Sequence, residues 1–386
     1  MSETKPVIAA SVKSYPPAFR SGGPTRSMAE VANRLSSDFE FRVVTSIDDN
    51  GHDLREDGVV PIQWQPRANA RVSAIPLGKR ASFRVLKQLR SVDADIVYLN
   101  SLFNPVFTLA PLLARRFGLL RPALTVIAPR GELDLGALEI KSRRKRRMLR
   151  MLRLFGLTKR VVWHATSEDE ASNIEREFGA RAELVVASNL RALQVEPPTR
   201  RPRSERVHLV FMSKIDRKKN LETAVDAVAQ CPNATLTVIG PIKDEQYWAE
   251  VLDRAASTGV INRFDYVGTV EPDRIINRLR AFDLFILPTH GENFGHAILE
   301  ALAAGVPVLV SDKTPWSHVE AAGAGWVCDP SDVAGFADRI RSFHAMDDDQ
   351  RHVMRLNAAK LAEKYVNDPA PVEAHRQLFG LPVRVS

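Results

Sequence analysis

Two glutamates stand eight positions apart in a stretch that is otherwise largely apolar, "HGENFGHAILEALAAGVPVLVSD" (290–312). The second, Glu300, is the one charged residue of a helix that we expect over 294–304 and that Gly305 and Pro307 stop. Its neighbours one turn away are mostly small and cannot neutralise a buried carboxylate. Two ribose hydroxyls would satisfy its oxygens. The alternatives are a side chain that reaches solvent or one that pairs with a distant arginine.

The first glutamate, Glu292, lies in the turn before this helix, between Gly291 and Gly295. Glycines let the backbone approach a ligand closely, and the start of the helix offers N–H groups and a positive dipole to a phosphate. Glu292 itself suits the hydroxyls of a sugar better than a phosphate. Alternatively it caps the helix, because the same dipole favours a carboxylate there.

Two lysines in another strand-to-helix connection, "FMSKIDRKKNLETAV" (211–225), could serve the same ligand. We expect Lys214 at the end of the strand and Lys219 near the start of the helix. A lysine there opposes the helix dipole, which suggests that an anion offsets the repulsion. Two cations and helix N-termini could stabilise a departing diphosphate without a metal ion. We interpret Arg217 and Lys218 as solvated side chains.

Short β-rich runs alternate with helical patterns along the chain and must position these side chains. The candidate strands are residues 6–12, 41–46, 95–100, 124–129, 161–166, 183–188, 207–213, 234–240, 263–268, 283–288 and 306–311. A capping box, Ser167 with Glu170, and Gly179 mark the ends of one helix. Such alternation predicts parallel sheets with helices on both faces, and ligands bind at the carboxyl ends of such strands.

We therefore expect an α/β protein of two doubly wound, Rossmann-like domains that face each other across a cleft. The chain has 386 residues, of which 45% are hydrophobic, enough for two cores. The N-terminal domain would take residues 1–190 and the C-terminal domain residues 207–365. Residues 191–206, rich in proline and arginine and without periodicity, indicate a linker.

The positive charge is concentrated in the first half of the chain. Residues 1–200 hold 32 Lys and Arg against 21 Asp and Glu, whereas residues 201–386 hold 22 against 25. Much of it lies in "KSRRKRRMLRMLR" (141–153), a basic amphipathic helix suited to an anionic membrane surface. The candidate membrane contacts are Arg143, Arg144, Lys145, Arg146 and Arg147. The alternatives are a solvated helix or nucleic-acid binding, although no aromatic platform, zinc spacing or helix-turn-helix signature accompanies the run.

Several classes of protein lack support in the sequence. No apolar run is long enough for a transmembrane helix, and the N-terminus lacks the apolar core of a signal peptide. Cys231 and Cys328 have no metal-ligand spacing and fit a reducing compartment. The motifs GxxxxGK[ST], HExxH and GxSxG are absent, and the "DAD" at 93–95 has no supporting neighbours. We expect no metal and no cofactor.

Three motifs occur in order along the chain: the glycine pair in "RSGGPTRSMAEVANRL", the connection "SKIDRKKNL" and the paired glutamates of "ENFGHAILE". Together they resemble the family-four retaining glycosyltransferases of the GT-B fold. The likeness covers nearly the whole chain, and "PRGELDLGALEIKSRRKR" resembles bacterial polysaccharide-assembly members. The resemblance implies a metal-independent hexosyltransferase that moves a sugar from a nucleotide diphosphate to an acceptor such as a lipid-linked glycan. It also implies that residues 366–386 pack back on the first domain.

The resemblance assigns roles to individual residues. Lys214 and Lys219 would hold the donor diphosphate and Glu300 the ribose. The transferred sugar would be bound by Glu292 and by the backbone of Asn293, Phe294, Gly295 and His296. A loop of the first domain would be formed by Gly22 and Gly23. The base would stack near Gly240, Tyr266, Val267 and Gly268. Lys214, Lys219 and Glu292 are thus the expected catalytic set. Arg130 is a further candidate phosphate contact or else a turn residue.

Two positions depart from the family pattern. Lys214 stands where an arginine is usual and loses the bidentate fork. Asn100 stands where many members have a histidine, and an asparagine cannot act as a base. In the family's front-face mechanism the departing phosphate can accept the proton of the acceptor hydroxyl.

The alternatives to a glycosyltransferase are a nucleotide-sugar epimerase or hydrolase of the same fold, or a non-catalytic nucleotide-sugar or nucleic-acid binding module. We expect a cytoplasmic protein, peripheral at the inner membrane face.

Overall fold

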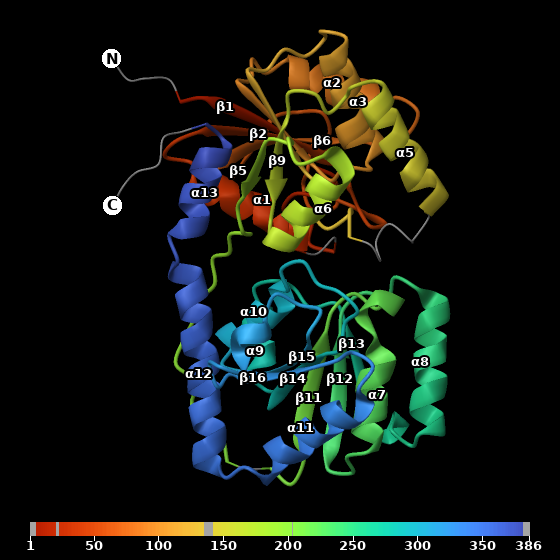
Figure 1. Ribbon diagram of the computed structural model, residues 1–386, viewed down its shortest axis with the longest axis vertical. Coiled ribbons are helices and arrows are strands. Elements are labelled where there is room, and N and C mark those ends of the chain that lie inside the picture. Colours follow the sequence, from red (N-terminus) through yellow and green to blue (C-terminus); the bar gives the residue numbers. More distant parts are fainter. Residues whose placement is uncertain (1–4, 21–22, 135–141, 203, 381–386) are drawn as a thin grey trace. The chain divides into compact units, whose positions relative to one another are not determined.

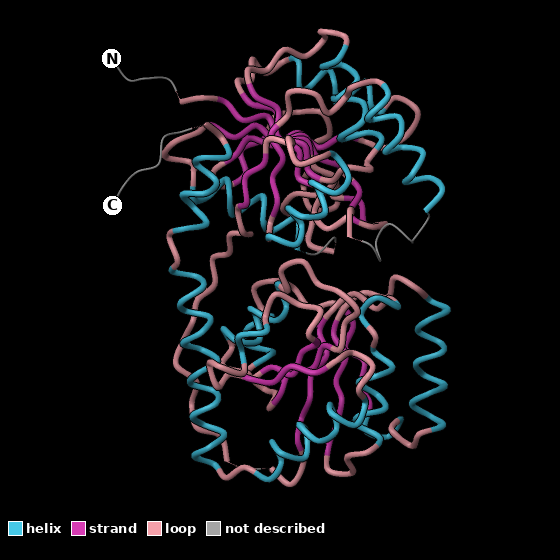
Figure 2. The backbone as a smooth tube through the Cα atoms, viewed as in Figure 1, coloured by secondary structure: helices cyan, strands magenta, loops and turns pink. Residues whose placement is uncertain are grey.

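The computed structural model describes residues 5–20, 23–134, 142–202 and 204–380, and the chain forms two compact units. The first unit comprises the chain up to Arg191 together with the residues from Pro369 onward, and the second runs from Ala192 to Asp368. Each unit holds one large sheet with helices against it (Figures 1 and 2). The chain therefore leaves the first unit once and returns to it at its carboxyl end.

The first unit alternates strands, most of them short, with helices. Its described elements are β1 (Val7–Ser11), α1 (Gly23–Arg34), β2 (Glu40–Ser46), β3 (Asp48–Asp49), β4 (His52–Asp53), β5 (Gln65–Arg67), β6 (Ala70–Ile75), α2 (Ala81–Arg90), β7 (Ile96–Asn100), a π-helical turn (Pro105–Leu109), α3 (Ala110–Arg116), β8 (Leu124–Ala128), α5 (Ser142–Leu154), β9 (Val162–Ala165), α6 (Glu168–Phe178), β10 (Leu184–Val186) and α13 (Ala370–Leu378).

The second unit alternates strands and helices more regularly. Its elements are β11 (Val207–Met212), a 3-10 turn (Arg217–Lys219), α7 (Leu221–Ala229), β12 (Ala234–Ile239), α8 (Glu245–Ser257), a 3-10 turn (Ile261–Arg263), β13 (Phe264–Gly268), α9 (Ile275–Leu279), β14 (Leu284–Leu287), α10 (His296–Ala303), β15 (Val308–Ser311), a 3-10 turn (Ser317–Val319), β16 (Gly325–Cys328), α11 (Val333–Ala345) and α12 (Asp348–Asn367).

Both large sheets are essentially parallel, as the sequence predicted. The first has the order β10-β9-β8-β7-β1-β2-β6-β5, in which the edge strand β5 runs antiparallel to its neighbour and the others run parallel. The second has the order β13-β12-β11-β14-β15-β16 and is parallel throughout. In each sheet the strand order reverses, between β1 and β7 and between β11 and β14. Ligands of open α/β sheets bind at such a reversal, outside the carboxyl ends of the two strands.

The central strands are buried on both faces, which explains their unbroken apolar character. Every residue of β14 and β15 is buried, as is every residue of β7. In the first unit Leu378 and Phe379, at the end of α13, enter a core cluster with residues of β1 and α1. Parallel strands covered by helices on both sides lose the polar and apolar alternation of a half-exposed strand.

Some elements differ from the sequence expectation. The strands β6 and β16 were not predicted, and the helix expected over 294–304 begins only at His296, because Gly295 takes a left-handed conformation (φ 79°) and caps it. Ser167 does cap α6, accepting from the Glu170 N–H at 3.2 Å. Among the described helices, none combines the length and apolar run that a bilayer span requires.

Candidate active site

The strand reversal of the second sheet brings together the two connections that carry the predicted lysines and glutamate. β11 and β14 are neighbours, with Leu209 opposite Leu284. The loop after β11 carries Lys214 and Lys219, and the loop after β14 carries Glu292. The two loops therefore meet at the edge of the sheet where a ligand is expected.

The centre of this site is an ion pair between Lys219 and Glu292. The Lys219 Nζ lies 2.5 Å from the Glu292 Oε2, with only 7% of the lysine side chain and 22% of the glutamate side chain exposed. Burial raises the pKa of Glu292, but the charges of Lys219, Lys218 and His296 outweigh it and hold the pKa at about 2. Glu292 is thus ionised at neutral pH. From the position of Lys219 near a helix start, the sequence predicted a ligand anion beside it. In the structure the carboxylate of Glu292 is such an anion.

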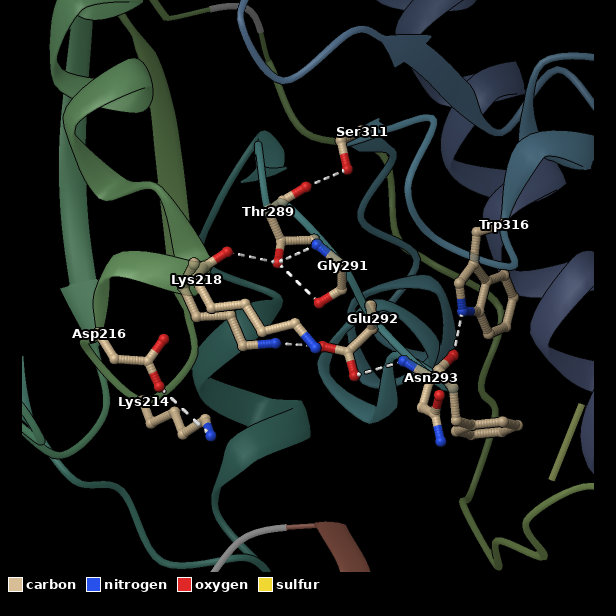
Figure 3. A network of polar contacts seen from close by, with 11 residues as sticks. Lys214, Asp216, Lys218, Thr289, Gly291, Glu292, Asn293, Ser311 and Trp316 are labelled. Carbon is tan, nitrogen blue, oxygen red and sulfur yellow. Dashed lines mark hydrogen bonds and ion pairs between the residues drawn. The ribbon is translucent and has the colours of Figure 1, made fainter. Parts of the chain in front are cut away.

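The other basic residues of the first loop have distinct surroundings. Lys214 follows β11 rather than ending it, and its Nζ lies 3.3 Å from Asp216 (Figure 3). Arg217 makes a bidentate ion pair with Glu250 of α8, as expected of a surface residue. Lys218 differs from the sequence interpretation: it is half-buried, and its charge lowers the pKa of Glu292.

Buried hydroxyl and amide groups fix the two loops to each other. Thr289 donates from its hydroxyl to the Lys218 carbonyl at 2.9 Å, and Ser311 donates to the Thr289 carbonyl at 2.6 Å (Figure 3). Asn220, in a left-handed conformation (φ 56°), donates to the carbonyls of Pro288 and Pro330, each at 2.9 Å. These bonds hold the lysines and Glu292 in place without using the charged groups themselves.

The start of α10 is held by an indole. Trp316 donates from Nε1 to the Phe294 carbonyl at 2.5 Å, and its ring lies against Gly295, where an added Cβ would approach the indole nitrogen to 2.8 Å. Asn293 donates its backbone N–H to Glu292 Oε1 at 3.1 Å. This arrangement leaves no room for a side chain at position 295.

The predicted ribose ligand Glu300 lies within α10. The residue is 4% exposed, and it stands one helical turn after His296. It is buried, as the apolar segment predicted, so it does not reach solvent as a surface glutamate would. The structure therefore leaves two of the sequence interpretations, a partner within the protein and a ligand.

The predicted base site lies at the ends of β12 and β13. Gly240 (φ 139°) approaches the end of β11 so closely that a Cβ there would lie 1.9 Å from the Ser213 carbonyl oxygen. Its N–H donates to the Gly268 carbonyl at 2.8 Å, and Tyr266 donates from its hydroxyl to the Gly240 carbonyl at 3.0 Å. Val267, on the same strand, is half-buried. Gly240 thus links these residues to the Lys214 loop.

The remaining predicted donor contacts fall in the first unit. Gly22 lies outside the described residues, and Gly23 is the first residue of α1. Arg130, with φ 58°, donates to three protein acceptors: Asn100 Oδ1 at 2.7 Å, Asn189 Oδ1 at 2.5 Å and the Tyr98 hydroxyl at 2.7 Å. The guanidinium therefore joins the loop after β8 to strand β7 and to the segment after β10. The role of Arg130 as a phosphate contact stays a prediction.

Half-buried Glu132 and buried Glu170 support the loop around Arg130. Glu132 accepts from the Ser101 hydroxyl at 2.8 Å and from the Leu102 N–H at 2.6 Å. Burial raises its pKa against these hydrogen bonds. Glu170 accepts from the Gly131 N–H at 2.6 Å. Since Glu170 serves this loop, it does not complete the predicted capping box with Ser167.

The predicted membrane contacts lie on α5 in the first unit. Arg143, Arg144, Arg146 and Arg147 are exposed and Lys145 is half-buried. The amphipathic pattern is correct in its main feature, since the opposite side of the helix is buried.

Some residues of the site were not identified from the sequence. Trp316, Thr289 and Ser311 are separated from Lys218 by 71 residues or more, and only the tertiary fold brings them together. For Lys218, a run of three basic residues before a helix was available as a signal. No group of three or more His, Cys, Asp or Glu residues suited to a metal ion occurs within the described ranges.

The two halves of the chain match two sequence families. Residues 22–189 match the glycosyl transferase 4-like domain, and residues 196–361 match the family Glycosyl transferases group 1. The chain belongs to the group 1 glycosyltransferases. Its two Rossmann-like units give it the GT-B fold of that group.

Curated relatives of this glycosyltransferase match part of the chain. A glycogen synthase of Mycobacterium tuberculosis is 30% identical over 207 residues, which are 52% of this chain and 48% of that protein. The lipopolysaccharide core biosynthesis mannosyltransferase LpsB of Rhizobium meliloti is 35% identical over 106 residues, 27% of this chain and 29% of that protein. The chain thus spans about half the length, or less, of the curated relatives it matches.

Solved structures share the fold over nearly the whole chain. A sucrose-phosphate synthase from Thermosynechococcus elongatus superimposes with a TM-score of 0.73 at 16% identity and covers 97% of this chain and 98% of its own. The Anabaena protein HepE in complex with UDP-glucose gives a TM-score of 0.71 at 15% identity, with coverage of 97% and 98%. At these identities the likeness concerns the fold alone.

Proposed function

We propose that this glycosyltransferase transfers a hexose from a nucleoside diphosphate donor to a glycan acceptor with retention of anomeric configuration. The observation that carries the proposal is the cluster of lysines and Glu292 at the strand reversal of the second sheet. The cluster combines Lys214, half-buried Lys218 and the Lys219–Glu292 pair in loops that buried hydrogen bonds hold together. The complex of HepE with UDP-glucose, in a protein of the same fold, supports a nucleotide-sugar donor.

In this proposal the lysines stabilise the departing diphosphate. Its charge grows as the bond from the anomeric carbon to the phosphate oxygen breaks, and preorganised cations stabilise that charge best. Lys214 and Lys218 would supply attraction at the phosphates. Lys219 would act partly through Glu292, which it orients. No metal ion is required for this role, since the protein provides the positive charge.

The new bond forms between the anomeric carbon and an acceptor hydroxyl oxygen on the same face of the sugar. The hydroxyl proton passes to the departing phosphate oxygen, which becomes more basic as the old bond breaks. Asn100 would position the acceptor hydroxyls, because its amide cannot take a proton. Glu292, already ionised and engaged with Lys219, would accept hydrogen bonds from the hydroxyls of the transferred sugar.

The acceptor in this proposal is a lipid-linked glycan of cell-surface polysaccharide synthesis. The relatives named glycogen synthase and lipopolysaccharide core mannosyltransferase support a glycan acceptor in general. The excess of positive charge on the first unit supports an acceptor that is anionic or linked to a lipid. We propose that the enzyme works in the cytoplasm at the inner face of the membrane.

Calorimetric titration of Glu300→Ala with nucleoside diphosphates tests the donor site. A buried carboxylate that holds two ribose hydroxyls should contribute about 2–3 kcal/mol, so donor affinity should fall at least about thirtyfold. Glu363→Ala, an exposed glutamate of α12, is the control and should bind as the wild type does. Unchanged affinity in Glu300→Ala would remove the ribose assignment.

Product analysis separates transfer from the two alternatives. A transferase forms a new glycosidic bond whose anomeric configuration, read by proton NMR, equals that of the donor. An epimerase or hydrolase releases an altered or free sugar without an acceptor, and a binding module turns over nothing. For a binding module, Lys214→Ala would weaken binding with no turnover to lose.

A further inference from the structure

Three helical segments of the first unit are strongly basic and contain no acidic residue. Residues 77–90, 105–122 and 142–160 hold five, three and nine lysines and arginines, with no aspartate or glutamate among them. They include α2 and α3, which contact each other, and α5, whose carboxyl end is hydrogen-bonded to the end of α3 (Figure 1). One side of this unit therefore carries an excess of positive charge.

The ends of α3 and α5 are joined directly. Arg116 donates from Nε to the Phe155 carbonyl at 3.2 Å, and Arg115 donates to the Lys159 carbonyl at 3.0 Å. These bonds bring two chain segments at the ends of the helices, 117–119 and 154–155, to the same part of the surface.

Large apolar side chains project from that part of the surface. Phe117 is 75% exposed, Leu119 53%, Leu154 81% and Phe155 56%. A single exposed leucine is common, but four large apolar residues at two joined helix ends are a patch that usually has a partner.

The core does not account for these four residues. The inward side of α5 is formed by Met148, Leu149 and Leu152, which are buried in the core of the first unit. Residues three or four positions apart share one face of a helix, so Arg143, Arg147, Arg150 and Leu154 form a single stripe, and all four are exposed. The stripe leads from three arginines to the apolar patch.

Two other basic residues of α5 point elsewhere. Arg153 pairs with Glu177 at 2.7 Å, and Lys145 lies over the ring of Phe103 at 5.5 Å. They belong to the packing of the unit. The stripe and the apolar patch are therefore distinct from the basic side chains that the fold itself uses.

We propose that this surface, which we call the docking face, binds an anionic lipid bilayer. It consists of Arg143, Arg147 and Arg150 with Phe117, Leu119, Leu154 and Phe155. The arginines would lie at the phosphate headgroups while the four apolar side chains enter the acyl boundary. Aliphatic anchors such as Leu119 and Leu154 gain from lipid but offer no ring for stacking on a nucleotide base, so the chemistry favours a membrane over nucleic acid.

Vesicle sedimentation tests the docking face without any donor or acceptor, so its outcome is independent of the proposed activity. The full chain is mixed with vesicles of phosphatidylcholine alone or of phosphatidylcholine and phosphatidylglycerol in equal amounts. We expect binding to the anionic vesicles only. Added salt should weaken the binding, since it screens the arginines, but should not remove the apolar contribution.

Two sets of variants separate charge from insertion. Arg143→Glu, Arg147→Glu and Arg150→Glu together should weaken binding about a hundredfold or more, given the usual contribution of each basic residue at a headgroup layer. Leu154→Ser with Phe155→Ser should weaken it about tenfold. The matched controls lie in the second unit: Lys243→Glu, Lys360→Glu and Lys364→Glu for charge, and Ile261→Ser with Val353→Ser for exposed apolar groups.

A local probe reports insertion directly. A polarity-sensitive fluorophore at Leu154→Cys, with Cys231 and Cys328 replaced by alanine, should shift to the blue on anionic vesicles, and the same label at Val353→Cys should not. The proposal is overturned if the wild type does not bind anionic vesicles, or if both variant sets bind like their controls. Binding of a single-stranded oligonucleotide through the same arginines, with no blue shift on vesicles, would overturn it in favour of nucleic acid.

Discussion

At the scale of single residues, the site depends on a buried lysine that the protein itself pairs with a carboxylate. Lys219 and Glu292 are 73 positions apart, and their 2.5 Å contact fixes the loop after β11 against the loop after β14. Removing one partner of such a pair leaves a buried charge without compensation, which strongly destabilises the folded protein. Replacing both partners by apolar residues costs much less. Glu292 should therefore contribute to folding as well as to binding.

The pH dependence of Glu292→Gln tests this coupling. The pKa of the carboxyl falls from its ordinary 4.5 to about 2 in the folded protein, so its stabilisation is complete above pH 4.5 and is lost as pH falls toward 2. Urea denaturation should show Glu292→Gln less stable than the wild type by about 2 kcal/mol at neutral pH, with the gap closing below pH 4.5. Glu250→Gln removes an exposed pair and should show a much smaller gap. A gap independent of pH would contradict the assignment.

Gly240 offers a second test at a single residue. A Cβ there would lie 1.9 Å from the Ser213 carbonyl, and the φ of 139° is unfavourable for any other residue. Gly240→Ala should therefore destabilise the protein by about 3 kcal/mol in urea denaturation and weaken nucleotide binding by displacing the Lys214 loop. Gly259 has a φ of 72°, but a Cβ added there would meet no atom within 4 Å. Gly259→Ala should therefore lower the free energy of unfolding by only about 1 kcal/mol. Equal losses in the two variants would show that the close approach carries no energy.

The sequence predicted these residues unequally, for physical reasons. Glu300 was recognisable as buried because it is a single charge among apolar residues within one helix. The partner of Lys219, by contrast, lies in another loop, and nothing local marks it. Arg130 was recognised as a turn residue or a ligand, but its contacts with Asn100, Asn189 and Tyr98 depend on strand order, which the sequence does not specify residue by residue.

At the scale of elements, periodicity predicted the buried central strands and also the edge strands β10 and β13, but it overlooked others. β6 contains an exposed Arg71 and a buried Ser73, so it lacks the continuous apolar run of a central strand. β16 is the edge strand of its sheet and has only four residues. A strand that is interrupted by polar residues, or that is this short, carries a weak pattern of its own and depends on its neighbours in the sheet.

The C-terminal helix α13 makes a prediction of its own. His375 packs against His164 with ring centroids 5.0 Å apart, and it donates from Nδ1 to the Pro371 carbonyl at 2.7 Å. Burial lowers the pKa of His375 to about 4 and that of His164 well below its ordinary value, with the charge of Arg130 adding to both effects. Each histidine is therefore neutral in the folded protein and takes up a proton readily only when unfolded.

Acidification should loosen α13 for this reason. As pH falls from 6.5 toward 4, the unfolded chain gains protons that the folded chain does not, and about 2 kcal/mol of stability should be lost through His375. Hydrogen exchange of residues 370–378 should quicken over this range in the wild type and much less in His375→Phe, which keeps the ring without the charge. Exchange that does not depend on pH in this range, after correction for intrinsic rates, would contradict the prediction.

At the scale of the whole molecule, the two units divide charge as well as sequence. The first half carries the excess of basic residues, and the second half is nearly balanced and slightly acidic. The clustered lysines at the strand reversal of the second sheet are therefore a local feature of the loops and not a consequence of a generally basic unit. This separation supports a donor site in the second unit and a charged docking face on the first.

Thermal unfolding of the full chain with UDP, GDP, ADP and TDP, each with and without EDTA, tests the central claim most directly. A ligand that binds only the folded state raises the melting temperature. At a ligand concentration of a hundred times its dissociation constant, it increases the free energy of unfolding by about 2.7 kcal/mol. We predict that one of these diphosphates stabilises the protein to the same extent with and without EDTA, and that Glu300→Ala reduces this stabilisation to about a third or less. If no diphosphate or sugar conjugate stabilises the protein, or if EDTA removes the effect, the metal-free donor site at the strand reversal is wrong.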